Sequence, residues 1–250
     1  MIKSNESKEM FAKELFLEAF SDSIQFVNQF EMLAFSPERC EYAYDGDRVV
    51  SALYWFDCFF GEEKIAYIYG VSTAQSHRKQ GYCKRLMEKT HERLLEGGYS
   101  GAILVPAKKE LYSFYGNMGY VTCTGISEKT VFASDVRVDL FRLNKHEFAS
   151  LRRKYLPENS VIEEGAALDL LSAYAEFYSG EDFVLVAERI DEGLRVTELL
   201  GNFEKAPQII KSLGYSSATV RGVGEDKPFA MYYPLSDDKA FPFYFGLALD

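Results

Sequence analysis

One junction constrains this chain more than any other feature: a strand pattern passes through a basic, glycine-containing turn into a helix pattern. Residues 64–73 alternate between two faces as a strand does, and residues 79–96 carry apolar side chains at helical spacing. Gly97 and Gly98 are expected to end that helix. Gly70, inside the strand, predicts a bulge or a close approach of another segment. Such a junction favours an α/β fold, in which helices pack against a sheet.

The segments around this junction complete one α/β unit. Two amphipathic helices are predicted, one over 7–20 and one from Phe26 to Leu33, and Pro37 marks the end of the second. A β-hairpin from Arg39 to Phe60 follows, with its turn at 45–47. After the central helix come a strand at 102–105, a helix at 108–118 and a strand at 120–132. We expect residues 1–133 to form one domain.

A similar pattern restarts in residues 134–250, which we expect to form a second domain. Its hairpin turns around Asp191-Glu192-Gly193, and its order of hairpin, helix and strands echoes residues 48–132. This echo predicts a degenerate repeat of the first unit. The predicted elements are a strand at 136–143, helices at 145–155 and 166–177, a hairpin at 183–200, a helix at 203–213, and strands at 218–220, 229–233 and 243–247.

The net charge of the chain indicates which classes of binding partner are expected. The net charge is −10 and the pI is about 5.0, which argues against a broad nucleic-acid-binding face. The acidity is uneven, at −3 over residues 1–133 and −7 over residues 134–250. Such a balance would attract a cationic substrate such as an amine, although it could equally be ordinary solubilising charge.

Cysteine usage and hydropathy predict a reducing compartment. The four cysteines lie far apart without a C-x-x-C pair, so we expect no metal site and no dithiol motif. Residues 1–6 lack the apolar run of a signal peptide, and no stretch approaches about 18 uninterrupted apolar residues. We therefore expect a cytoplasmic protein that does not cross a membrane.

The turn between the strand and the central helix has the properties of an anion site. A helix N-terminus presents unpaired backbone N–H groups and the positive end of the helix dipole, so it can cradle a pyrophosphate. Gly81 would let a phosphate approach the backbone, and Cys83 is small enough not to block it. By itself, such a turn also occurs as a plain connection between a strand and a helix.

A second element gives the turn its context. About thirty residues later stands Tyr115-Gly116-Asn117-Met118-Gly119-Tyr120. This order resembles the GNAT superfamily of acyl-CoA-dependent N-acyltransferases, which has a strand, an (R/Q)-x-x-G-x-(G/A) turn and a Y-x-x-x-G-(F/Y) element at this separation. The resemblance implies a mixed-sheet GNAT acetyltransferase fold. The loop 104–107 looks more like the enhanced intracellular survival branch, whose members carry a second acetyltransferase-like half.

The resemblance implies a set of cofactor-binding residues. The strand end from Val71 to Thr73 would contact the pantetheine arm of acetyl-CoA, and backbone N–H groups of the turn would bind its pyrophosphate. The turn matches the family at Arg78, Gly81 and Cys83, with Lys79, Gln80 and Tyr82 between them. Cys83 departs from the usual Gly or Ala and could crowd a phosphate oxygen.

Tyr115 falls where a family tyrosine often protonates the leaving CoA thiolate. A phenol, with a pKa near 10, is protonated at neutral pH and suits a general acid. Packing at a helix end is the alternative role for this ring. Backbone N–H groups near Gly70 and Val71 could polarise the thioester carbonyl.

A general base is harder to assign. Asp57 and the C-terminal carboxylate of Asp250 are candidates, although a solvated Asp57 or a water chain would serve as well. His77, beside the turn, could contact CoA, whereas His91 and His146 fall in predicted helices and are expected to be solvated or locally paired.

Together these residues predict an N-acetyltransferase that moves an acetyl group from acetyl-CoA to a primary amine in a ternary complex. A polyamine, an aminoglycoside, an amino acid, or a protein lysine or N-terminus could be the acceptor. The second half lacks an R-x-x-G-x-G turn before its helix at residue 203, so it should not bind CoA. It would instead close the acceptor cleft, with its acidic surplus beside the acceptor, or pair two subunits in a homodimer. A non-catalytic acyl-CoA-binding or regulatory module and a purely structural dimerisation protein are the alternatives.

Overall fold

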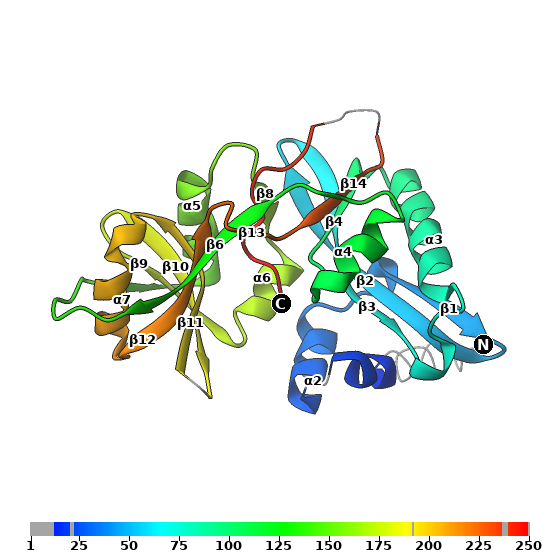
Figure 1. Ribbon diagram of the computed structural model, residues 1–250, viewed down its shortest axis with the longest axis horizontal. Helices are drawn as coiled ribbons and strands as arrows, with labels where there is room; N and C mark the ends of the chain where they lie inside the picture. The colour runs from blue at the N-terminus through cyan, green and yellow to red at the C-terminus, as the bar shows by residue number, and fades with distance from the viewer. Residues whose placement is uncertain (1–12, 21–22, 192, 237–239, 250) are drawn as a thin grey trace.

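The computed structural model describes residues 13–20, 23–191, 193–236 and 240–249. Within them, two mixed sheets of seven strands lie side by side (Figure 1). The first sheet has the order β1-β2-β3-β4-β14-β5, and β8 pairs with β2. Its strands are β1 (Cys40–Asp45), β2 (Arg48–Phe60), β3 (Glu63–Thr73), β4 (Gly101–Leu104), β14 (Met231–Pro234), β5 (Val121–Thr122) and β8 (Val161–Glu163).

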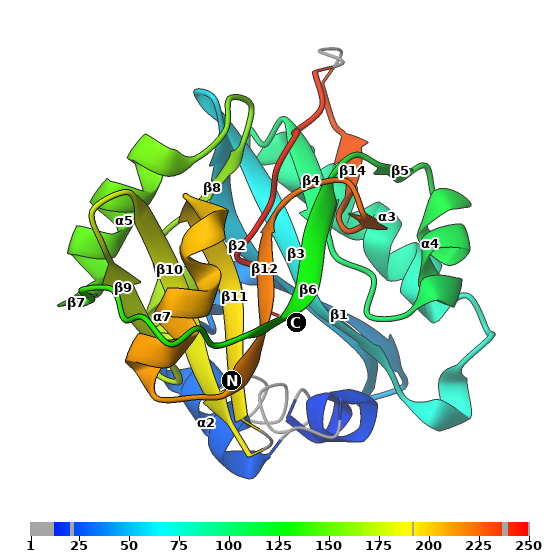
Figure 2. The ribbon, with the colours of Figure 1, turned by 60° about the vertical axis from the view of Figure 1, so that its left-hand side comes forward.

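The second sheet has the order β13-β6-β12-β11-β10-β9-β7. Figure 2 shows β12 between β6 and β11 in this sheet. Its strands are β13 (Lys227–Pro228), β6 (Gly125–Phe132), β12 (Ser217–Val223), β11 (Gly193–Gly201), β10 (Phe183–Ile190), β9 (Ala175–Ser179) and β7 (Phe141–Leu143).

The helices begin and end at residues suited to those positions. Ser23 accepts a hydrogen bond from the N–H of Phe26 at the start of α2 (Ile24–Leu33). Asn144 forms a reciprocal capping box with Glu147 at the start of α5 (Lys145–Tyr155). Residues 13–20 are also helical. The other described helices are η1 (Pro37–Arg39), η2 (Gln75–His77), α3 (Tyr82–Glu96), α4 (Lys109–Gly116), α6 (Ala166–Leu171), η3 (Phe203–Lys205) and α7 (Ala206–Leu213).

The two sheets share one topology and exchange strands. In the first, β2 and β3 are antiparallel and α3 leads to β4, which is parallel to β3. In the second, β10, β11, α7 and β12 repeat this order. However, β14 from the second half pairs with β4, and β6 from the first half pairs with β12. Sheet membership therefore does not follow the predicted division between residues 133 and 134.

Several predicted elements need correction. The strand expected over 120–132 is two strands, β5 and β6, in different sheets. The helix expected over 166–177 ends at Leu171, and β9 follows, because residues 175–179 bury every second side chain against the sheet. The strand expected over 136–143 shrinks to β7. The hairpins at 39–60 and 183–200 are confirmed.

Residues 243–247 form no strand; only an isolated bridge joins Tyr244 to Ser160. Side chains take the place of a strand ladder. Glu163 accepts a hydrogen bond from the N–H of Leu247 (3.1 Å), and the Tyr67 hydroxyl accepts one from the N–H of Leu249 (3.1 Å). This segment, buried from Tyr244 to Leu249, runs between the two sheets (Figure 1).

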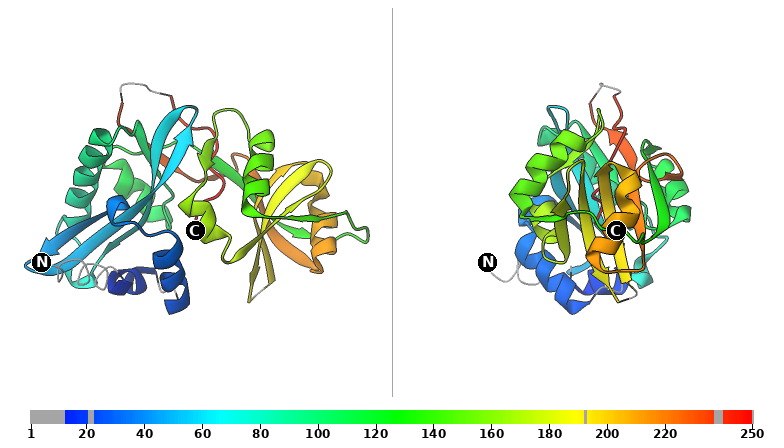
Figure 3. Two further views of the ribbon diagram at one scale, coloured as in Figure 1. Left: turned by 180° about the vertical axis from the view of Figure 1, so that it is seen from behind. Right: turned by 90° about the vertical axis from the view of Figure 1, so that its left-hand side faces the viewer.

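The two halves also meet through helices. From behind, α2 lies beside α6 (Figure 3), and the Phe26 and Tyr174 rings lie 6.0 Å apart, centroid to centroid. The largest apolar cluster includes Phe30 and Tyr54 from the first half together with Phe148 and Phe177 from the second. The space between the sheets is therefore bounded by packed side chains from both halves.

Candidate active site

Strands β3 and β4 separate at the centre of the first sheet. They pair only over residues 65–67 and 101–103, after which β3 continues to Thr73 while β4 ends at Leu104. On its other edge, β3 carries a bulge: its register with β2 shifts between Ala52 and Tyr54. Gly70 lies in this bulge with a φ of +61°, so the predicted bulge is confirmed.

A cavity of about 550 Å³ occupies the gap between these strands. One wall is β3 from Tyr67 to Val71, and the opposite wall is residues 104–107 with Tyr112 and Tyr115. The third wall comes from the second sheet and the C-terminal segment: Ile126, Glu128, Arg221, Lys227, Pro228, Phe229 and Leu249. The cavity therefore lies where both halves of the chain meet.

The turn that follows β3 is held by its own side chains. Arg78 Nε donates to the carbonyl of Thr73 (3.1 Å), and Gln80 Nε2 donates to the carbonyl of Ser76 (2.9 Å). Lys79 and Gly81 both have positive φ, at +62° and +80°. Because this left-handed backbone cannot continue a helix, α3 begins at Tyr82 rather than at residue 79 as predicted.

The N-terminus of α3 is suited to an anion. Gly81 is its N-cap and offers no side chain to the first backbone N–H groups, and no acidic residue stands in the first turn. Arg85 Nη1 donates to the carbonyl of Gln80 (3.2 Å) and lies 2.9 Å from the point where a Gly81 Cβ would be. A guanidinium and a helix N-terminus thus converge where the resemblance places the pyrophosphate.

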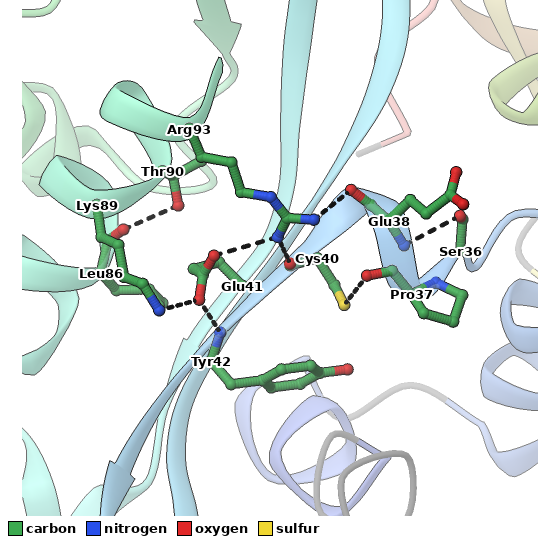
Figure 4. A network of polar contacts seen from close by, with 10 residues as sticks. All are labelled: Ser36, Pro37, Glu38, Cys40, Glu41, Tyr42, Leu86, Lys89, Thr90 and Arg93. Carbon is green, nitrogen blue, oxygen red and sulfur yellow. Dashed lines mark hydrogen bonds and ion pairs between the residues drawn. The ribbon is translucent and has the colours of Figure 1, made fainter. Parts of the chain in front are cut away.

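Ion pairs fix α3 against the first sheet (Figure 4). Lys89 Nζ and Arg93 Nη1 contact the two carboxylate oxygens of Glu41 on β1, at 2.6 and 3.2 Å. Arg93 also donates to the carbonyls of Cys40 (2.7 Å) and Glu38 (2.8 Å). Glu41 is only 8% exposed, so these ion pairs are sheltered from water. They fix the position of α3 relative to β1.

Tyr115 of α4, the predicted general acid, is one of the tyrosines that line the cavity. It is 7% exposed, with its ring against Phe114 and Tyr120. Burial, and then the nearby thiol of Cys83, raise the pKa of Tyr115 above its usual 10. The phenol therefore holds its proton at neutral pH and can only donate it.

Three other predicted cofactor-binding residues, Val71, Thr73 and Cys83, have different surroundings. Val71 lines the cavity. Thr73 lies at the strand end, where its hydroxyl is 2.8 Å from Ser51 Oγ. Cys83 packs into the apolar cluster that includes Tyr115, and burial raises its pKa to about 11. Its side chain thus packs, partly buried, against the core of the first half.

Asp57, His77 and His91 do not line the cavity. Asp57 accepts a hydrogen bond from the Tyr99 hydroxyl and is 3.3 Å from Lys64 Nζ. His77 Nε2 lies 3.1 Å from Asp45. His91 is paired with the Tyr120 hydroxyl (2.8 Å), and burial lowers its pKa to about 4. Asp250 lies outside the described residues, although Leu249 before it lines the cavity.

Two sets of residues at the candidate site were not predicted from the sequence. Arg85 stands four residues after Gly81, one helical turn on, and this spacing could have identified it. The charged residues of the third wall gave no such signal. Glu128, Arg221 and Lys227 are brought to the cavity by sheet pairing alone. They place two cations and one carboxylate where an acidic surplus was expected.

The corresponding helix of the second half does not repeat the anion turn. Asn202 accepts a hydrogen bond from the N–H of Glu204, and Pro207, near the start of α7, has no N–H to offer. Phe203 packs so closely on β12 that a Cβ at Gly222 would lie 2.9 Å from its ring. Within the described residues, this helix start therefore has a side-chain cap and a proline where α3 has Gly81.

The comparison with protein families agrees with this geometry. Residues 2–123 match the family model of the acetyltransferase (GNAT) domain. This part of the chain belongs to the GNAT acetyltransferase superfamily. The matched residues contain the anion turn and Tyr115 of the GNAT domain, while the third wall of the cavity lies beyond them. No protein among the curated sequences matches the chain.

Solved structures extend the similarity over both halves. A GCN5-related N-acetyltransferase from Anabaena variabilis superimposes with a TM-score of 0.71 at 15% identity, over 93% of this chain and 71% of that one. Eis1 from Mycobacterium abscessus gives 0.66 at 11%, over 91% and 71%. A tandem GNAT protein from the clavulanic acid biosynthesis pathway gives 0.56 at 10%, over 94% and 98%. The predicted GNAT fold with a tandem-like C-terminal half is confirmed.

Two further properties hold for the part of the chain that the structure describes. No helix in it combines the length and the apolar character needed to cross a bilayer. Nor do three or more of its His, Cys, Asp and Glu side chains come together as a potential metal site.

Proposed function

We propose that this protein is an N-acetyltransferase that transfers an acetyl group from acetyl-CoA to a primary amine by direct attack in a ternary complex. One observation carries the proposal: the gap between β3 and β4 is lined by a protonated tyrosine, and β3 ends in a turn suited to a pyrophosphate. The membership of residues 2–123 in the GNAT superfamily supports the same reaction class.

Acetyl-CoA supplies an acetyl group activated as a thioester. Its pyrophosphate would lie at the backbone N–H groups of residues 81–83, beside Arg85. The residues of the turn, Arg78, Lys79, Gln80 and Tyr82, shape this site, and Val71 and Thr73 mark the strand along which the pantetheine arm would extend. The residues present therefore fit the cofactor.

The chain's own groups can serve the remaining steps. Neither Gly70 nor Val71 pairs with β4, and both line the cavity, so their backbone N–H groups can polarise a carbonyl there. Tyr115 holds the proton that the departing thiolate needs. The acceptor amine would bind in the cavity beside its third wall, where the two halves of the chain meet.

Calorimetric titration of acetyl-CoA tests the binding site. Gly81→Leu should weaken binding about 10- to 100-fold, since losing one charge-assisted hydrogen bond costs about 1.5–3 kcal/mol. Gly98→Leu is the matched control, because Gly98 has a similar φ of +76° at the other end of α3 and open space around it. Equal affinities of the two variants, or no binding by the wild type, would contradict the proposal.

Release of the CoA thiol in the presence of an amine panel tests the reaction. Tyr115→Phe should lower kcat by about 10²-fold or more while leaving acetyl-CoA affinity unchanged, because the ring is kept and only the proton donor is lost. Acetyl-CoA binding without any turnover would instead indicate a non-catalytic binding module.

A further inference from the structure

The charged side chains of the cavity all stand on its third wall. Among the described residues that line it, only Glu128, Arg221 and Lys227 carry a charge. Glu128 lies on β6, Arg221 on β12 and Lys227 on β13, so all three come from the second sheet. The walls made by β3, the loop after β4 and α4 are aromatic or apolar.

These three groups are organised around the carboxylate. Glu128 and Arg221 are direct cross-strand partners in the pairing of β6 with β12, and their side chains approach to 3.4 Å. Lys227 Nζ lies 2.6 Å from the other carboxylate oxygen. These contacts lower the pKa of Glu128, so it is ionised at neutral pH. The carboxylate of Glu128 therefore pairs with both Arg221 and Lys227, and these three side chains together carry a net charge of +1.

The arginine is fixed in place as well as charged. Its side chain is 7% exposed, and its guanidinium lies 4.8 Å from the centre of the Phe229 ring. Tyr112 of α4 donates to the carbonyls of Pro228 and Phe229 (2.9 and 2.8 Å), which ties this strand to the GNAT domain. A preorganised guanidinium in a sheltered cavity is well suited to a carboxylate, which it can bind through two parallel hydrogen bonds.

We infer that the acceptor is an amine that also carries a carboxylate, such as an amino acid, and that Arg221 and Lys227 bind this carboxylate. This inference rests on the proposed function. A polyamine or an aminoglycoside would bring several positive charges against a wall that is already positive. The aromatic rings of Phe16, Tyr67 and Tyr69 leave the opposite side of the cavity apolar, which favours an acceptor with a small or apolar body.

The test is acetyl transfer from acetyl-CoA to the protein amino acids, to their amides and to spermidine, each at equal concentration. The best amino acid should exceed its own amide in kcat/KM at least tenfold. Lys227→Gln and Arg221→Gln should reduce this ratio to near one. Lys129→Gln should leave it unchanged, because Lys129 is a similarly exposed lysine on β6 that pairs with Asp226 and does not line the cavity.

A binding measurement separates this inference from the proposed function. N-acetyl derivatives of the same amino acids, titrated into the protein with CoA, should bind at least tenfold more tightly than their amides, and Lys227→Gln should abolish the difference. Turnover with an amide or spermidine at least equal to that with every amino acid would overturn the inference and leave the acetyltransferase in place. Selective binding of the acids without any turnover would overturn the acetyltransferase and keep the anion site.

Discussion

Arg152 should be among the residues that matter most for stability, because one guanidinium serves two buried carboxylates. Its Nε and Nη2 donate to Glu198 (2.7 and 2.9 Å), and its Nη1 lies 2.9 Å from Glu163. All three side chains are at most 3% exposed. Arg152→Met would leave two carboxylates without their cation, and removing one partner of a buried pair typically costs about 3–5 kcal/mol.

The cost of Arg152→Met should depend on pH. Burial already raises the pKa of Glu163 to about 7 in the intact cluster. A carboxyl with a raised pKa stabilises the fold most below its ordinary value of 4.5, and this contribution, about 3 kcal/mol for such a shift, is lost as the pH rises through 7. Without Arg152, the pKa of Glu163 should rise further, because the attraction of Arg152 is what now lowers it. The deficit should therefore be small at pH 5 and largest at pH 8.

Urea unfolding at pH 5, 6, 7 and 8, followed by the fluorescence of Trp55 and by far-UV circular dichroism, measures this deficit. Arg153→Met is the matched control, since Arg153 pairs with Glu164 on the surface with 55% of its side chain exposed, and such pairs contribute at most about 1 kcal/mol. Glu163→Gln in the Arg152→Met background should recover part of the loss. A deficit below about 1 kcal/mol at pH 8, or one that does not change with pH, would refute the reasoning.

Three further outcomes are expected. Gly70→Ala should lower the free energy of unfolding in urea by about 1–3 kcal/mol, because a Cβ at its φ of +61° would lie 2.7 Å from the Phe16 ring. Gly46→Ala is the control, since Gly46 has a similar φ in open space, and it should cost less. Equal losses in the two variants would argue against the clash. Burial lowers the pKa of His91 to about 4, so its contribution to stability should be complete above pH 6.5 and fall towards pH 4, and His91→Phe should flatten this part of the stability curve. Arg85→Met should weaken acetyl-CoA binding about 5- to 20-fold and reduce its salt dependence, and an unchanged salt dependence would place Arg85 outside the anion site.

The sequence by itself determined the parts of this protein that depend on neighbouring residues. The bulge at Gly70, the end of α3 at Gly97 and Gly98, and the anion turn at Gly81 all follow from the backbone conformations that glycine allows. The hairpin turns and helix caps are equally local. The GNAT fold was predicted from the resemblance of this local order of turn and tyrosine to that superfamily.

Only the tertiary structure decided what faces the cavity. The break between β5 and β6 sends two adjacent strands into different sheets, and no local pattern marks the exchange of β6 for β14. Glu128 and Arg221 are 93 residues apart and meet through strand register. A strand was expected over the segment 243–247, yet its backbone is irregular, and Glu163 and Glu198 accept hydrogen bonds from it. These contacts form only when the two halves pack together. Hydrophobic periodicity describes one segment at a time, so it cannot predict them.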